Sequence, residues 1–447
     1  MNGRDTLRAV VARVALCAMG VVWFGLHSPA FAQPITAPER PDAQRESSAP
    51  SAGKTPRDES VAADEAIDYS STRTEVAGAP LIGGNSDIGF EFGGVLTATH
   101  FGENQRPYRW NSDLVLAASV KDGPSGTEIA QQNYLLQLDV PDLIPRRLRF
   151  IITGSFQRTV NYGYYGVSGG RTTPASPSLG RFYQFDQREA IIRTLSQVVL
   201  SRPYMLLIAA NLRYLDPHAY RGSQLALDAE AGRIRGVHAV GIGALGVGVG
   251  YDTRDNEFFP SRGLFHQFGV KGSYGVPASA SVGYGSIGAV ICGYLPLGSS
   301  VVLAGRALID AQVGHVPFYD LSLGGIFQVD ELPGGPGGIR GVPLGRYRGL
   351  VKAISNLELR ARVLQFRLWS ASFRLGGALF ADVGRAFRDY RFRTERTAPA
   401  LNWGSGAGLY LQWGQAALFR ADAAYSPDAA VNGGFPLGIY VAQGVMF

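Results

Sequence analysis

The chain has 447 residues and a formal net charge of +6, and charged residues make up only 17% of it. This excess of positive charge is small for the length and the arginines are dispersed, so the charge pattern does not point to nucleic acid. Hydrophobic residues make up 46%, with 58 glycines, 23 phenylalanines and 20 tyrosines. After the first segment no run of 18 apolar residues occurs, which excludes membrane-spanning helices. An exported protein of this composition is then either a soluble β protein or a closed barrel in lipid.

Residues 1–32 are typical of a secretory signal. Three arginines precede an apolar run at 14–26, and Ala30-Phe31-Ala32 then offers small residues for cleavage. The apolar run is too short to span a membrane. Cys292 is the one cysteine beyond this signal, so no intramolecular disulfide is expected.

Residues 33–76 are rich in Pro, Ser, Ala and charged side chains and have few aromatic ones. A segment of this composition does not bury a core, so it predicts a disordered periplasmic linker. The remaining residues, 77–447, are expected to form one domain.

From about residue 77 apolar and polar side chains alternate with a period of two. In 147–161, Leu148, Phe150 and Ile152 fall on one face, and Arg149, Thr153 and Gln157 on the other. The pattern continues for most of the chain with no helical period, which favours a transmembrane antiparallel β-barrel with lipid outside and a polar lumen. We expect sixteen strands, at 78–84, 87–100, 109–121, 130–142, 147–162, 182–198, 203–216, 235–251, 263–275, 280–296, 300–313, 351–365, 370–387, 401–413, 417–427 and 435–447.

An even strand number agrees with bacterial barrels, whose short turns face the periplasm and whose longer loops face outward. With sixteen strands the tight links follow even strands. The long links 163–181, 217–234 and 314–350 then fall on the outer side.

A well-defined turn, YDTRDNEFFPSRG, occupies residues 251–263. Asp and Asn side chains can bind the turn backbone, proline fixes φ and glycine permits a close bend. We expect a structural role for its residues Asp252, Arg254, Asp255, Asn256, Pro260 and Gly263.

A glycine-rich loop, GGPGGIRGVPLGRYRG at 334–349, carries Arg340 and precedes two strands that each place an acid on the polar face. Alternation with Leu357 and Leu359 points Glu358 inward, and alternation with Leu379 and Val383 points Asp382 inward. A buried carboxylate needs a cation, and a guanidinium can bind one with two parallel bonds. The alternative is that Glu358 pairs only with Arg360 or Arg362 and that Arg340 is solvated.

These motifs resemble the BamA/TamA family of outer-membrane barrels, also called bacterial surface antigens. The family's turn has the form D-x-R-D-N…P-x-x-G, its loop tip matches Gly338, Ile339, Arg340 and Gly341, and Val342 replaces the usual Phe or Tyr. The resemblance implies that the loop folds into the lumen and that Arg340 locks it to Glu358 and Asp382. Gly444 to Phe447 resembles the terminal signal read during insertion. The family's periplasmic docking (POTRA) domains are larger than 33–76, and none fits here.

The resemblance implies a protein of the bacterial outer membrane that takes part in insertion or translocation of protein, or of lipid, through a weak seam between its first and last strands. Its partners would be outer-membrane lipid and lipopolysaccharide, with a periplasmic partner or an unfolded polypeptide client, and the barrel would be a monomer. No cofactor, metal, nucleic acid or enzyme activity is expected. Two alternatives stay open: a gated pore for small solutes, and an esterase using Ser168 in the G-x-S-x-G stretch 166–170.

Overall fold

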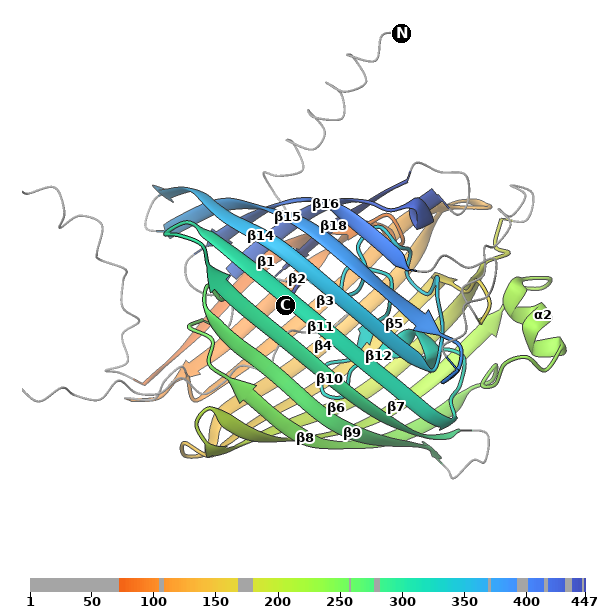
Figure 1. The fold of residues 1–447 in the computed structure, drawn as a ribbon, viewed down its shortest axis with the longest axis horizontal. Coiled ribbons are helices and arrows are strands. Elements are labelled where there is room, and N and C mark those ends of the chain that lie inside the picture. The colour runs from red at the N-terminus through yellow and green to blue at the C-terminus, as the bar shows by residue number, and fades with distance from the viewer. Residues whose placement is uncertain are drawn as a thin grey trace, which may run out of the picture.

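The computed structural model describes residues 72–103, 108–167, 180–256, 259–276, 282–368, 371–391, 401–413, 417–430, 436–443 and 446–447. In them sixteen antiparallel strands close into one barrel, as the sequence predicts (Figure 1). The wall strands are β1 Arg73–Asn85, β2 Gly89–Phe101, β3 Trp110–Gly123, β4 Gly126–Ile144, β5 Leu148–Gly163, β6 Gln184–Ser201, β7 Tyr204–Ala219, β8 Val240–Asp252, β9 Gly263–Val276, β10 Gly283–Pro296, β11 Val301–His315, β14 Val351–Leu368, β15 Ala371–Phe387, β16 Asn402–Trp413, β17 Ala417–Tyr425 and β18 Leu437–Gln443. No helix among the described residues is long and apolar enough to cross a membrane.

The alternation predicted from the sequence sorts side chains between the two faces of the wall. In β10, Ile287 and Ile291 are about half exposed on the outside, whereas Cys292 and Tyr294 are buried on the inside. An apolar outer face with a mixed inner face is what a barrel in lipid requires.

The predicted signal at 1–32 lies outside the described residues, and so does most of the predicted linker. β1 starts at Arg73, so the wall begins within the last residues assigned to that linker. Of the motif at 166–170 the structure describes only Gly166 and Val167, so Ser168 lies outside the described residues.

A buried hydrophobic cluster lies at the end of the barrel where the β5–β6 and β7–β8 links run. The short helix α2, Gln224–Glu230, belongs to this region and is capped by the side chain of Ser223. The cluster comprises Tyr164, Phe185, Leu215, Leu225, Val240, Ile242, Val282, Tyr284, Val316, Phe318, Tyr319 and Leu321.

Residues 316–350, between β11 and β14, fold back inside the barrel (Figure 1). This lumen loop contains the 3₁₀ turn η2, Asp320–Ser322, and the two-residue strands β12, Leu323–Gly324, and β13, Asp330–Glu331, which pair with each other. Nearly all of its residues are buried, although the loop carries many polar groups. The expected internal loop is therefore present, and it fills much of the lumen.

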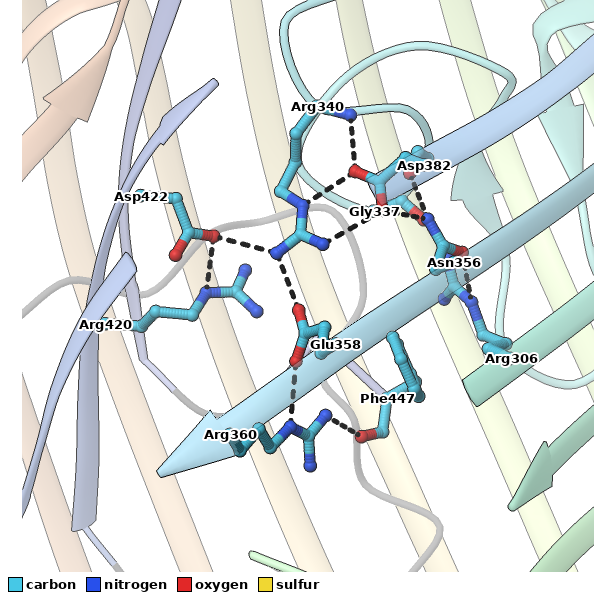
Figure 2. Close-up of polar contacts among 11 residues, drawn as sticks. Arg306, Gly337, Arg340, Asn356, Glu358, Arg360, Asp382, Arg420, Asp422 and Phe447 are labelled. Carbon is cyan, nitrogen blue, oxygen red and sulfur yellow. Dashed lines mark hydrogen bonds and ion pairs between the residues drawn. The ribbon is translucent and has the colours of Figure 1, made fainter. Parts of the chain in front are cut away.

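Two strand predictions at the barrel closure are wrong. β1 has 13 residues instead of the seven expected at 78–84. β18 has seven residues and ends at Gln443, whereas 435–447 was expected. Alternation alone extends the last strand to the chain end, but Phe447 lies inside the lumen beside arginine side chains (Figure 2). The alternation of apolar and polar residues along one strand does not reveal this contact, because the arginines come from other strands.

The closure between β1 and β18 is narrow. Among the described residues it has two register pairs, Gly84 with Val441 and Asn85 with Tyr440. β18 pairs with β17 along its whole length, from Leu437 to Gln443. The seam is therefore weak because β18 is short and overlaps β1 at only two pairs. It is not weak because the first strand is short, since β1 has 13 residues.

Candidate functional site

Glycines shape the tip of the lumen loop. Gly341 has φ +90°, a conformation that side chains with a Cβ rarely adopt. A Cβ at Gly338 would lie 2.2 Å from the carbonyl oxygen of Pro333, so the chain must pass there without a side chain. Hydrogen bonds from Gly335 N to Val342 O and from Ile339 N to Pro333 O close the tip. The compact turn leaves Arg340 projecting toward the wall.

Arg340 binds Asp382 on β15 with a two-pronged contact (Figure 2). Its Nε donates to Oδ2 at 2.8 Å and its Nη2 donates to Oδ1 at 2.9 Å. The main-chain N of Arg340 also donates to Oδ2 at 3.1 Å. The geometry is the parallel fork that a guanidinium makes with a carboxylate.

Two further carboxylates face the same guanidinium. Nη1 of Arg340 donates to Oε1 of Glu358 on β14 at 2.6 Å and to Oδ2 of Asp422 on β17 at 3.3 Å. The Cζ atom lies 3.5 Å from the ring centre of Phe380, so the cation also stacks on an aromatic face. Burial alone would lower the pKa of Arg340, but Glu358 and Asp382 raise it above its usual value.

Opposite charges balance in this buried group. Arg360 Nε donates to Oε2 of Glu358 at 2.8 Å, and Arg420 Nε lies 3.0 Å from Oδ2 of Asp422. Three arginines therefore face three carboxylates, and we call these six side chains the arginine cluster: Arg340, Arg360, Arg420, Glu358, Asp382 and Asp422 (Figure 2). Balanced pairing is what keeps charges tolerable at such depth.

Neutral groups hold the main chain of the tip. Asn356 on β14 donates to the carbonyl of Gly338 at 2.8 Å and to Asp382 Oδ1 at 2.9 Å. On the opposite side, Gly341 N donates to the hydroxyl of Tyr440 on β18 at 2.9 Å. The tip therefore touches both β14 and the last strand of the closure.

The structure brings together Arg340, Glu358 and Asp382, the three residues assigned to the lock from the sequence. Glu358 also pairs with Arg360, so both pairings considered for it occur at once. Asp422 was missed, although the alternation in β17 with Ala421 and Ala423 already placed it on the inner face. Val342 is buried and packs in a cluster with Ile339 and Tyr347.

The turn motif makes the contacts its residue types suggest. Asp252 accepts from Arg254 N at 2.9 Å and Arg254 Nη2 at 2.7 Å. Asn256 Oδ1 accepts from Phe259 N at 2.9 Å. Gly263 has φ +106°, and a Cβ there would lie 2.3 Å from the carbonyl oxygen of Thr253.

Asp255 binds the far side of this turn, accepting from Ser261 N at 2.9 Å and Arg262 N at 3.1 Å. Partial burial alone would raise the pKa of Asp255, but the hydrogen bonds from Ser261 and Arg262 outweigh it and lower the pKa. Pro260 is buried at the end of the turn.

Of the predicted insertion signal, Gly444 lies outside the described residues and Phe447 lies in the lumen. Among the residues that the structure describes, no three His, Cys, Asp or Glu side chains are grouped as a metal ion would need.

Comparison with known families and structures agrees with this fold. Residues 242–439 match the Omp85 superfamily domain, and they include the lumen loop and the whole arginine cluster. The matched residues thus resemble the Omp85 superfamily domain, and the barrel is that of a bacterial outer-membrane protein. No curated protein matches the sequence.

Solved structures with a similar fold include CdiB from Escherichia coli, at 15% identity and a TM-score of 0.51, covering 83% of this chain and 62% of that chain. Another is BamA from Haemophilus ducreyi lacking POTRA domains 1-3, at 12% identity and a TM-score of 0.49, covering 83% of this chain and 70% of that one. This chain spans less than two thirds of the CdiB chain, and the likeness to CdiB supports the fold alone.

Proposed function

We propose that this protein inserts polypeptide into the outer membrane, or passes it across, by opening the seam between β1 and β18. The observation that carries the proposal is the length of that seam. β1 pairs with β2 over all 13 of its residues, but with β18 only at Gly84 and Asn85 among the described residues.

The open part of β1 is the reason why a polypeptide fits this seam. Between Thr74 and Gly83 the edge of β1 that faces β18 has no strand partner among the described residues. Unpaired backbone groups are costly in a membrane-embedded wall. An incoming extended segment can satisfy them by adding a strand to the edge.

Space for such a segment lies directly inside the seam. A cavity of about 260 Å³ is lined by Asp87 and Ile88 from the β1–β2 link, by Leu437 and Tyr440 of β18, and by Gly341 of the loop tip. Because Gly341 donates to Tyr440, the loop tip and the seam share a contact. Release of Arg340 from its carboxylates would therefore loosen the seam as well as the lumen.

The test cross-links the seam in a Cys292→Ala background. Ser86 N donates to Ile439 O at 3.4 Å across it, so Ser86→Cys with Ile439→Cys places a disulfide there. The probe is a urea-denatured small outer-membrane barrel added to vesicles that contain the protein. We expect the vesicles to speed its folding, the oxidised cross-link to abolish the effect, and reduction to restore it.

The matched control keeps Ile439→Cys and moves its partner to Ala423→Cys, which faces it on β17. That cross-link leaves the seam free and should leave the folding rate of the probe unchanged. Unaltered acceleration with a locked seam would overturn the proposal. Fast release of trapped small solutes with no effect on the probe would instead favour a gated pore.

A further inference from the structure

We propose that a second closure, next to the arginine cluster and sharing Arg360 with it, shuts the end of the lumen where β8 turns into β9. In this aromatic gate, Phe447 and Phe259 meet on the guanidinium of Arg360. Short turns mark the periplasmic end of such barrels, so the gate faces the periplasm. The inference concerns the passage itself and holds whatever the barrel transports.

Phe447 is bound on several sides. Its carbonyl oxygen accepts from Arg360 Nη2 at 3.1 Å (Figure 2). Its ring centre lies 5.1 Å from Cζ of Arg360 and 5.4 Å from Cζ of Arg306. The ring also packs on a buried cluster of the inner wall formed by Phe265, Cys292, Tyr294, Val302 and Ala304. A ring held between two cations and an apolar wall is a specific contact.

Phe259 reaches the same place from the turn motif. Its ring centre lies 4.9 Å from that of Tyr410 on β16 and 5.8 Å from Cζ of Arg360. Along the wall, β9 and β16 are separated by β10, β11, β14 and β15. Contact between the turn and β16 therefore crosses the mouth of the lumen instead of following its rim.

The turn motif explains why Phe259 points inward. Asn256 binds Phe259 N, and Asp255 binds Ser261 N just beyond it. These bonds fix the backbone on both sides of the phenylalanine. The role of the motif is then to hold an aromatic side chain across the passage, in addition to making the bend.

Arg360 links the aromatic gate to the arginine cluster. Its Nε binds Oε2 of Glu358, and the other oxygen of the same carboxylate binds Arg340. Glu358 therefore sets the direction of the Arg360 guanidinium, and Arg360 in turn positions the two rings that rest on it.

Cys292 reports on the gate, since it is buried in the cluster that Phe447 covers and is the only cysteine beyond residue 17. The experiment measures its labelling by a small methanethiosulfonate reagent in the refolded barrel. We expect Phe447→Ala to raise the rate about tenfold, as loss of a cation–π-bound ring should favour local opening. Phe447→Tyr should keep the slow labelling rate. The labelling rate in Arg360→Lys should lie between those of wild type and Arg360→Gln.

Phe366 offers a matched control, because its ring stacks on Phe373 at the outer face, away from the lumen. Phe366→Ala should label as slowly as wild type. Phe259→Ala leaves the last strand untouched and should raise single-channel conductance in planar bilayers. Folding is checked by the shift in gel mobility on heating. Unchanged labelling in folded Phe447→Ala, or unchanged conductance in Phe259→Ala, would overturn the gate.

Discussion

Arg340 and Asp382 are 42 residues apart in the chain and form a two-pronged pair that ties the lumen loop to β15. Both side chains are fully or almost fully buried. Removing one partner of such a pair leaves an uncompensated charge, which costs far more than an exposed ion pair contributes. We therefore expect the strength of this contact to decide whether the loop is a fixed plug or a movable one.

Arg340→Ala should release the loop. It leaves Glu358, Asp382 and Asp422 facing two arginines, and we expect a loss of about 3–5 kcal/mol in the free energy of unfolding. Single-channel conductance in planar bilayers should rise. Arg340→Lys should recover only part of both properties, since an ammonium group cannot form the fork. Full recovery by lysine would show that charge alone holds the loop.

Asp422→Asn should cost less than Asp382→Asn. Arg340 reaches Asp422 by one bond of 3.3 Å, whereas three bonds reach Asp382. Urea unfolding of the two variants in the same detergent compares them directly. Equal losses of unfolding free energy would mean that the bond lengths do not rank the contacts.

Gly341→Ala should disturb the loop tip. At φ +90° an alanine is strained, and its Cβ would lie 2.8 Å from Cβ of Ser426. We expect a loss of about 1–3 kcal/mol, measured as a lower melting temperature. Gly272→Ala is the control, because a Cβ there meets nothing within 4 Å. A drop of equal size in both variants would point to a general effect of glycine replacement.

Glu331 should make the stability of the loop depend on pH. Burial raises its pKa from 4.5 to about 8, against the attraction of Arg348 and Lys352. Between these two values the folded protein holds a proton that the unfolded chain releases, so stability falls as pH rises. The melting temperature should therefore be lower at pH 9 than at pH 6. Glu331→Gln should flatten this change, and an identical pH profile in the variant would contradict the assignment.

Alternation predicted the number of strands correctly, and the inner-facing side of the strands that carry the acids, because it is a local property of a wall with lipid on one side. Asp382 follows from its neighbours Leu379 and Val383, and Glu358 from Leu357 and Leu359. Each prediction needs only the two-residue period and a handful of adjacent positions.

Contacts across the lumen could not be predicted in this way. Asp422 was on the inner face by the same rule, but its approach to Arg340 depends on the curvature of the closed barrel and on the path of the loop. Phe447 fits the apolar pattern of a last strand, yet its ring lies against Arg360 and Arg306. Such cation–ring contacts join residues far apart in the chain and leave no periodic trace.

A double-mutant cycle between Arg340→Ala and Asp382→Ala, read as single-channel conductance and as unfolding free energy, tests most directly whether this pair holds the lumen loop. Strong coupling is expected: once one partner is lost, removing the other should change conductance little and should restore part of the stability. Strictly additive stability losses, with conductance unchanged in both single variants, would show that the loop is held by other contacts.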